Sequence, residues 1–306
     1  MGRFLLIRLG QTIIILFLMS IIVFSLARLT GDPVSLLITE SATKEDIKYI
    51  TKELGLDKSL PTQYGIFLFN TIKGDLGRSV RGAQTPVTDL ILDRAPASLQ
   101  LATLSLLVSL LIGLPLGVLS AVKRGSFWDV GARILAMLGQ SAPVFWLGLM
   151  GMYLFAVELR WLPASGYGRI DNFVLPVLSL SCFAISAITR LGRNSMLEVL
   201  DNEYIKLAKV KGISEIKVVF KHALRNSLIP VITFSGTVLA RLITGAVVVE
   251  TIFEWPGIGR LAYESVIARD FPVVQGVVLF MTTIFVLVNL VVDNLYAYID
   301  PRIRYD

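Results

Sequence analysis

Histidine and cysteine are almost absent, with one of each among the 306 residues. The lone cysteine, Cys182, cannot form a disulfide within the chain, and a free cysteine in an apolar segment is most often a small packing residue. The lone histidine, His222, has no second histidine or cysteine to share a metal with. We therefore expect no metal site, and we interpret His222 as a hydrogen-bonding residue.

Motifs of common enzymes are also missing. The chain has no G-x-x-x-x-G-K-[ST] run, so it is not expected to bind the phosphates of ATP itself. It has no H-E-x-x-H, no nucleophile–base arrangement and no paired acids in its apolar segments, which argues against an intramembrane enzyme. Ser105, Ser109 and Ser181 lie in those segments, where serine is most often a helix-packing residue.

Long apolar segments, in contrast, are abundant. Hydrophobic residues make up 54% of the chain and charged residues 17%, and the mean hydropathy is +0.70. A helix that crosses the bilayer needs about 20 mostly apolar residues, and the segments lack the alternation of barrel strands. The sequence predicts an all-α polytopic membrane protein with six transmembrane helices at residues 9–27, 99–121, 130–157, 172–191, 228–249 and 273–298.

The first apolar segment could instead be a secretory signal, since Arg3 and Arg8 precede it and Ser25-Leu26-Ala27 resembles a cleavage site. Its length of about 19 residues exceeds the 7–15 of a typical signal core. We interpret it as a retained signal-anchor.

Basic residues gather in segments that alternate along the chain. The loop 193–226 has seven Lys and Arg against four acids, and further basic residues lie at 3, 8, 123, 124, 302 and 304. The positive-inside rule then places both termini in the cytoplasm. This topology explains the charge, so nucleic acid is not an expected partner.

The predicted organisation has four parts: a first transmembrane helix (1–28), an external helical segment (29–97), a five-helix membrane core (98–300) and a cytoplasmic tail (301–306). Capping residues predict three short helices in the external segment, at about residues 43–55, 59–74 and 85–95, the last ending before Pro96.

The cytoplasmic loop 193–227 is predicted to form a helical hairpin. One helix runs from Glu203 to Lys211 and ends at Gly212, and Ser214 begins the next. The second helix has an apolar stripe formed by Ile216, Val219, Phe220, Ala223 and Leu224. The pattern fits either a partner-binding hairpin or one that only anchors the loop on the membrane surface.

At this loop the sequence resembles the membrane subunits of bacterial ABC importers, in particular the dipeptide/oligopeptide/nickel permease family. Ala208, Gly212 and Leu224 match the general motif of these importers, whereas other motif positions are occupied by Lys206, Leu207, His222 and Arg225. The resemblance extends in collinear order through Gly31-Asp32-Pro33, Gly74-Asp75-Leu76-Gly77, Val122-Lys123-Arg124-Gly125, the stretch from Glu250 to Arg260, and Asp300-Pro301-Arg302.

The resemblance implies a type I importer architecture in the bacterial or archaeal cytoplasmic membrane. It implies a second related permease subunit, two cytoplasmic ATPase subunits that hold ATP and Mg²⁺, and an extracytoplasmic solute-binding protein; this chain would bind no cofactor. Contact with the ATPase is implied for Glu203, Ala208, Lys211, Gly212 and Ser214. Contact with the binding protein is implied for Glu254, Trp255, Pro256 and Gly257.

Arg241 lies inside the fifth predicted span, near its middle. A charge at the centre of a membrane helix costs about 2.5–3.5 kcal/mol on insertion scales, so Arg241 should face protein or water. It could line the solute pathway and attract a carboxylate, or it could form a structural ion pair, for example with Asp293.

The expected function is therefore that of the transmembrane subunit of an ATP-driven importer of di- or oligopeptides. Nickel or another metal chelate, glutathione and other small solutes are alternatives within this class. An ion-coupled secondary carrier is a more distant alternative, because such carriers need ionisable groups at mid-membrane and the spans contain no acid there.

Overall fold

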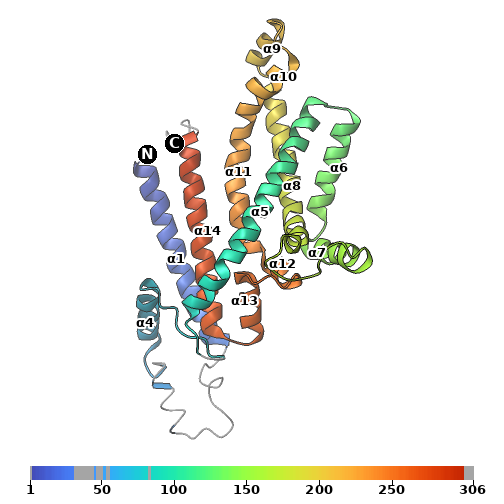
Figure 1. Ribbon diagram of the computed structural model, residues 1–306. Coiled ribbons are helices and arrows are strands. Elements are labelled where there is room, and N and C mark those ends of the chain that lie inside the picture. Colours follow the sequence, from blue (N-terminus) through green and yellow to red (C-terminus); the bar gives the residue numbers. More distant parts are fainter. Residues whose placement is uncertain (1, 31–44, 46–50, 53–55, 82–83, 300–306) are drawn as a thin grey trace.

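The computed structural model describes residues 2–30, 45, 51–52, 56–81 and 84–299, and this part of the chain is nearly all helical (Figure 1). The helices are α1 (Gly2–Thr30), α4 (Leu60–Ile72), α5 (Val87–Val122), α6 (Phe127–Ser141), α7 (Val144–Met152), η1 (Tyr153–Glu158), α8 (Asp171–Leu200), α9 (Glu203–Val210), α10 (Glu215–Lys217), η2 (Val218–Ala223), α11 (Leu224–Gly245), α12 (Val247–Ile252), α13 (Ile258–Ile267) and α14 (Phe271–Ile299). Helices satisfy their own backbone polar groups, as a lipid environment requires.

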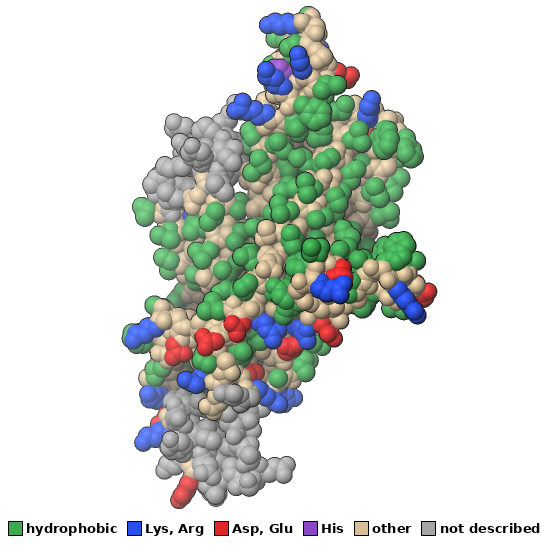
Figure 2. Space-filling view, in the orientation of Figure 1, with side chains coloured by type: hydrophobic (Ala, Val, Ile, Leu, Met, Phe, Trp, Pro, Cys, Tyr) green, Lys and Arg blue, Asp and Glu red, His purple; other side chains and the backbone are tan. Residues whose placement is uncertain are grey.

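Within the described residues, five helical segments are long and apolar enough to cross a membrane: α1, α5, α8, the continuous stretch from α10 through α11, and α14. The bent pair of α6 and the segment α7–η1 makes a sixth span if it is counted as one. Hydrophobic side chains cover the middle of the bundle, and charged side chains gather toward its two ends (Figure 2). The predicted all-α membrane architecture is confirmed.

The third predicted span is not one straight helix. The chain bends by 100° between α6 and α7, so the prediction of a continuous helix over residues 130–157 was wrong. The bend lies at Ala142 and Pro143, both of which have extended backbone angles. Proline disfavours helical conformation in the residue before it, which explains why α6 ends there.

The prediction that an external helix ends before Pro96 was also wrong. Helix α5 continues through Pro96 and Pro115, so the proposed division at residue 97 falls inside a helix of 36 residues. Helix α4 does begin after Ser59, with Pro61 in its first turn, as expected. Most of the helix predicted at residues 43–55 lies outside the described residues, which include only 45 and 51–52 of that range.

Small residues bring α5 and α8 into close contact. Ser105, Ser109, Gly113 and Gly117 recur every fourth residue on the face of α5 that meets α8. The Ser109 hydroxyl donates to the Ser181 carbonyl oxygen at 3.3 Å. A Cβ at Gly113 or Gly117 would come within 2.8 Å or 2.6 Å of a carbonyl oxygen of α8. The expectation that the serines are packing residues is confirmed, and this small-residue spacing is typical of membrane helix pairs.

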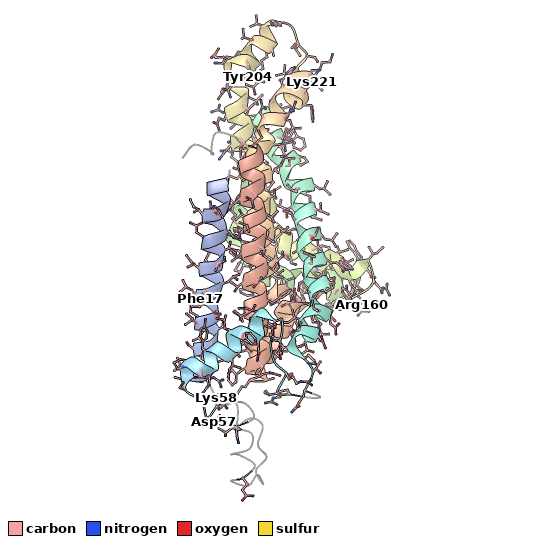
Figure 3. The ribbon with its side chains drawn as sticks, turned by 90° about the vertical axis from the view of Figure 1, so that its left-hand side faces the viewer. Phe17, Asp57, Lys58, Arg160, Tyr204 and Lys221 are labelled. Atoms are coloured by element: carbon pink, nitrogen blue, oxygen red, sulfur yellow. The ribbon has the colours of Figure 1, made fainter. Side chains whose placement is uncertain are left out.

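The bundle has two different ends. The hairpin, whose first arm is α9 and whose second arm is α10 with η2, extends beyond one end, on the side where α1 begins and α14 ends (Figure 1). Helices α4, α12 and α13 lie at the opposite end. The labelled Tyr204 and Lys221 lie on the two arms of the hairpin, whereas Asp57 and Lys58 lie at the other end (Figure 3).

Candidate functional site

The hairpin is closed by a left-handed glycine. Gly212 has a φ of +75°, a conformation that glycine adopts without the steric cost a Cβ imposes. The backbone N–H of Ile213 donates to the Ala208 carbonyl oxygen at 3.2 Å. The predicted end of the helix at Gly212 is therefore confirmed, with α9 finishing at Val210.

The hairpin has its own small core and a separate set of exposed apolar side chains. Its core joins α8, α5 and both arms, and its buried members are Ala121, Met196, Ile205, Ala208, Val218, Val219 and Ala223. Outside this core, Val210 is 85% exposed and Ile216 is 73% exposed. The apolar stripe of the second arm is thus divided: Val219 and Ala223 face inward, whereas Ile216 and Phe220 face outward.

Four of the five predicted coupling residues are exposed on the hairpin: Glu203, Lys211, Gly212 and Ser214. Ala208 is the exception, because its side chain is buried in the hairpin core. Its side chain contributes internal packing, and contact of this position with the ATPase stays a prediction. Glu203 forms an exposed ion pair with Lys206, with 2.8 Å between Oε1 and Nζ.

A buried carboxylate ties together the helices below the hairpin. Asp129 of α6, only 2% exposed, accepts from the guanidinium of Arg193 in α8 at 2.8 Å. It also accepts from the Ser120 hydroxyl at 2.6 Å and from the backbone N–H of Gly125 at 2.9 Å. We call these four residues the Asp129 clamp. It joins the turn between α5 and α6 to the helix that leads into α9. Sequence reasoning missed the clamp, since its two charged members are 64 residues apart.

Arg241 occupies an exposed position close to the end of α11. It is four residues from Gly245, where the helix ends, so the expectation that it sits near the middle of its span was wrong. Asp293 pairs instead with Arg8, with 3.3 Å between their side-chain atoms. The suggested Arg241–Asp293 ion pair is therefore not formed.

The face of α11 that carries Arg241 also carries threonines. Thr233, Thr237 and Thr244 lie at helical spacing with it, and all three are partly exposed. Thr233 donates to the Ile229 carbonyl oxygen at 3.0 Å, and Thr244 donates to that of Ala240 at 3.1 Å. Their spacing in the sequence could have revealed this polar stripe on an otherwise apolar helix.

At the opposite end, a buried glutamate organises the turn between α12 and α13. Glu250 is fully buried. It accepts from the Ser98 hydroxyl of α5 at 2.6 Å and from the backbone N–H of Arg260 at 3.0 Å. Burial raises the pKa of the Glu250 carboxyl, and these donors partly oppose that shift. A Cβ at Gly257 would lie 2.3 Å from the carboxylate, which explains the glycine there.

Trp255 is a core residue of this turn. Its side chain is fully buried, it donates its indole N–H to the Ala97 carbonyl oxygen at 2.9 Å, and its ring packs edge-on against Tyr167 and Phe173. The prediction that Trp255 contacts a binding protein is therefore corrected. Gly257 is buried too.

Two predicted contact residues of this turn remain accessible. Glu254 is exposed with a φ of +52°, and Pro256 is partly exposed.

Among the described residues, no group of three His, Cys, Asp or Glu side chains is placed to hold a metal ion.

Comparison with known protein families decides the identity of this arrangement. Residues 113–305 match the model for the binding-protein-dependent transport system inner membrane component, and residues 1–102 match that for its N-terminal region. The chain belongs to this permease family. It is the membrane subunit of an ABC importer in the cytoplasmic membrane, and ATP hydrolysis takes place on separate subunits.

Several relatives cover nearly the whole permease. A putative peptide transport system permease protein of Brucella abortus (strain 2308) is 42% identical over 98% of both chains. A dipeptide transport system permease protein of Alkalihalophilus pseudofirmus is 38% identical, covering 94% of this chain and 95% of its own. A glutathione transport system permease protein of Escherichia coli O6:H1 is 40% identical over 95% of both chains.

Solved structures show the same fold. A chain of the inward-facing MetNI methionine ABC transporter superposes with a TM-score of 0.59 and 19% identity, covering 69% of this permease and 96% of that chain. A chain of an amino acid ABC transporter gives a TM-score of 0.54.

Proposed function

We propose that this permease carries di- or oligopeptides, that its α9–α10 hairpin couples it to the ATPases, and that α11 lines the solute pathway. The hairpin carries the coupling proposal. It extends beyond the bundle and exposes apolar side chains, notably Val210 and Ile216, that a monomer leaves in water. Apolar side chains grouped on a projecting element are typical of a partner-binding surface.

The peptide assignment rests on the relatives named for peptides and dipeptides. Glutathione is the second candidate, since one relative of similar identity is named for it. Both kinds of solute carry carboxylates, which a guanidinium binds in a bidentate manner. Arg241 is suited to this role, because an exposed charge on a membrane helix needs water or another subunit beside it.

The proposed assembly has a second related permease, two cytoplasmic ATPase subunits that hold ATP and Mg²⁺, and an extracytoplasmic solute-binding protein. The hairpin end, which is also the end of both termini, would face the cytoplasm, as the basic loop favours. Glu254 and Pro256, at the opposite end, would then be available to the binding protein.

The coupling proposal is tested in the complete importer, reconstituted with its binding protein. Val210→Asp places a charge on the exposed hairpin surface and should reduce solute-stimulated ATP hydrolysis and uptake at least about tenfold. Ile170→Asp is the matched control, because Ile170 is 90% exposed at the start of α8, away from the hairpin. Equal coupling in the two variants would refute the role of the hairpin.

The pathway proposal is tested by uptake of labelled peptides and glutathione. Arg241→Met should lower uptake of carboxylate-bearing solutes while the amount of assembled complex stays normal. The control is Arg160→Met, since Arg160 lies outside the helical bundle (Figure 3). Normal uptake by Arg241→Met would exclude a direct role of Arg241. Peptides and glutathione are distinguished by competition, because the preferred solute should reduce uptake of the other one more strongly.

A further inference from the structure

A second polar feature lies between α6 and α8, apart from α11 and the hairpin. A cavity of about 280 Å³ opens there. Its lining includes three arginines, namely Arg133 of α6 and Arg190 and Arg193 of α8. The amides of Gln140 and Asn194 also line it. The cavity is small, so it fits one compact group better than an extended solute.

The charge of the cavity is only partly balanced. Asp129 is the carboxylate beside it, 2.8 Å from Arg193 and 3.5 Å from Arg133. Arg190 forms no ion pair within the described part of the chain. Three guanidinium groups thus meet one carboxylate, which leaves the cavity positively charged and suited to an anion.

A buried hydroxyl without a partner provides a second, independent observation. Thr189 lines the cavity and is only 3% exposed, and its Oγ1 has no hydrogen-bond partner among the described residues. Buried polar groups nearly always have a partner, and leaving one unpaired costs free energy. A ligand oxygen in the cavity would satisfy this hydroxyl.

The surroundings of α6 indicate where the anion comes from. This helix packs mainly against α5 and α8 and lies at the edge of the bundle (Figure 1). Its outward side chains are apolar, and Ile134 and Leu135 are more than half exposed. Phe127 and Trp128 at its start are 83% and 59% exposed, and such aromatic residues gather at the level of lipid headgroups. Arg133 follows Trp128 by little more than one helical turn.

We infer that the cavity between α6 and α8 binds a phosphate group, supplied by the headgroup of an anionic phospholipid. Arg133 and Arg190 would contact the phosphate oxygens, because guanidinium groups form strong, paired hydrogen bonds with phosphate. Thr189 would donate its free hydroxyl. Arg193 would remain with Asp129 and orient the site.

The test uses the complete importer in phosphatidylcholine nanodiscs, titrated with phosphatidylglycerol and followed by native mass spectrometry. The variant Arg133→Gln/Arg190→Gln removes the two arginines that would contact the phosphate: Arg190, which forms no ion pair among the described residues, and Arg133, the more distant partner of Asp129. It should weaken phosphatidylglycerol binding at least about tenfold. Lys123→Gln/Arg124→Gln is the matched control: it removes two positive charges from the neighbouring turn and should bind normally. Arg193 is left unchanged because losing it together with Arg133 would leave the Asp129 carboxylate without a positive partner.

Thr189→Val is the second variant, since it removes the hydroxyl and keeps the shape of the side chain. It should weaken lipid binding without lowering thermal stability in the absence of phosphatidylglycerol. Equal lipid binding by the wild type and both cavity variants would overturn the inference.

Two further arms separate the sources of the anion. Inorganic phosphate at millimolar concentration should leave lipid binding unchanged if the headgroup is the ligand. Displacement of the lipid by phosphate would show that a free anion is accepted, and would overturn the assignment to lipid. Loss of peptide uptake in the cavity variants with unchanged lipid binding would place the cavity in the solute pathway and also overturn the inference.

Discussion

Replacing Arg193 by methionine is expected to destabilise the hairpin end of the bundle. Asp129 is 2% exposed and would lose its strongest donor, while the Ser120 hydroxyl, the Gly125 N–H and the more distant Arg133 guanidinium at 3.5 Å would remain. Breaking a fully buried ion pair costs about 3–5 kcal/mol. Because Arg193 is 18% exposed and Asp129 keeps other donors, we expect about 2 kcal/mol here.

A double-mutant cycle isolates the pair. Asp129→Asn should also destabilise the complex, and the double variant should lose about 1–2 kcal/mol less than the sum of the single variants. The assay is unfolding of the purified complex in detergent, followed by near-UV circular dichroism. The control is Arg169→Met, because Arg169 forms an exposed ion pair with Asp171 and its loss should have no measurable effect. A coupling energy below about 0.5 kcal/mol would refute the reasoning.

Three further predictions concern single residues. Folding raises the pKa of the Glu250 carboxyl, so the folded protein binds this proton more tightly than the unfolded chain does. The stability of the complex should therefore be highest at a pH below the ordinary carboxyl pKa, and it should fall as the pH rises through the raised pKa of Glu250. Glu250→Gln should reduce this fall in a thermal melt series, and identical pH profiles would contradict it. Gly212→Val should lower coupled ATP hydrolysis more than Gly212→Asn, because asparagine tolerates a φ of +75° better than valine does. A Cβ added at Gly212 meets no neighbouring atom, so the difference would come from the backbone and not from a clash. Equal effects of the two substitutions would argue against backbone strain as the cause. Trp255→Phe should cost about 1–2 kcal/mol of stability through the lost bond to Ala97, with normal affinity for the binding protein in the complex that remains folded; weaker binding-protein affinity would restore a contact role.

The membrane architecture was predictable because hydropathy is a local property of the sequence. Each long apolar segment reports its own preference for lipid, and only helices satisfy the backbone there. The positions of the prolines were a poorer guide to where helices end, because proline accompanies a helix end at one place in this chain and lies inside a helix at another. Pro143 accompanies a 100° bend, whereas Pro96 lies inside a continuous helix. Tertiary contacts decide between these outcomes, and one sequence does not report them.

The candidate sites were predictable only where neighbouring residues define them. Gly212 follows a short helix, so its left-handed turn could be inferred from local spacing. Asp129 and Arg193 meet only because α6 and α8 pack together, and no spacing reveals such a pair. Trp255 was expected to contact a binding protein because the family resemblance implies such a contact for this loop. Its burial follows from the way the loop folds back against Ala97 of α5.

The proposed sites are connected by one nearly continuous helical path. From Glu215 the chain runs through α10, η2 and α11 to α12, which ends at Ile252. The hairpin lies at one end of this path, and Arg241 lies toward the other end. At that other end, Glu250 accepts a hydrogen bond from the Ser98 hydroxyl of α5. A displacement of the hairpin would therefore reach the polar face of α11 through the backbone of the same helix. The π-helical segment η2 lies where the hairpin joins α11, and such segments are often found at functional positions because they interrupt the regular hydrogen-bond ladder. Coupling by this route needs no long chain of side-chain contacts, since the second arm of the hairpin and the element that would face the solute are parts of one helical path.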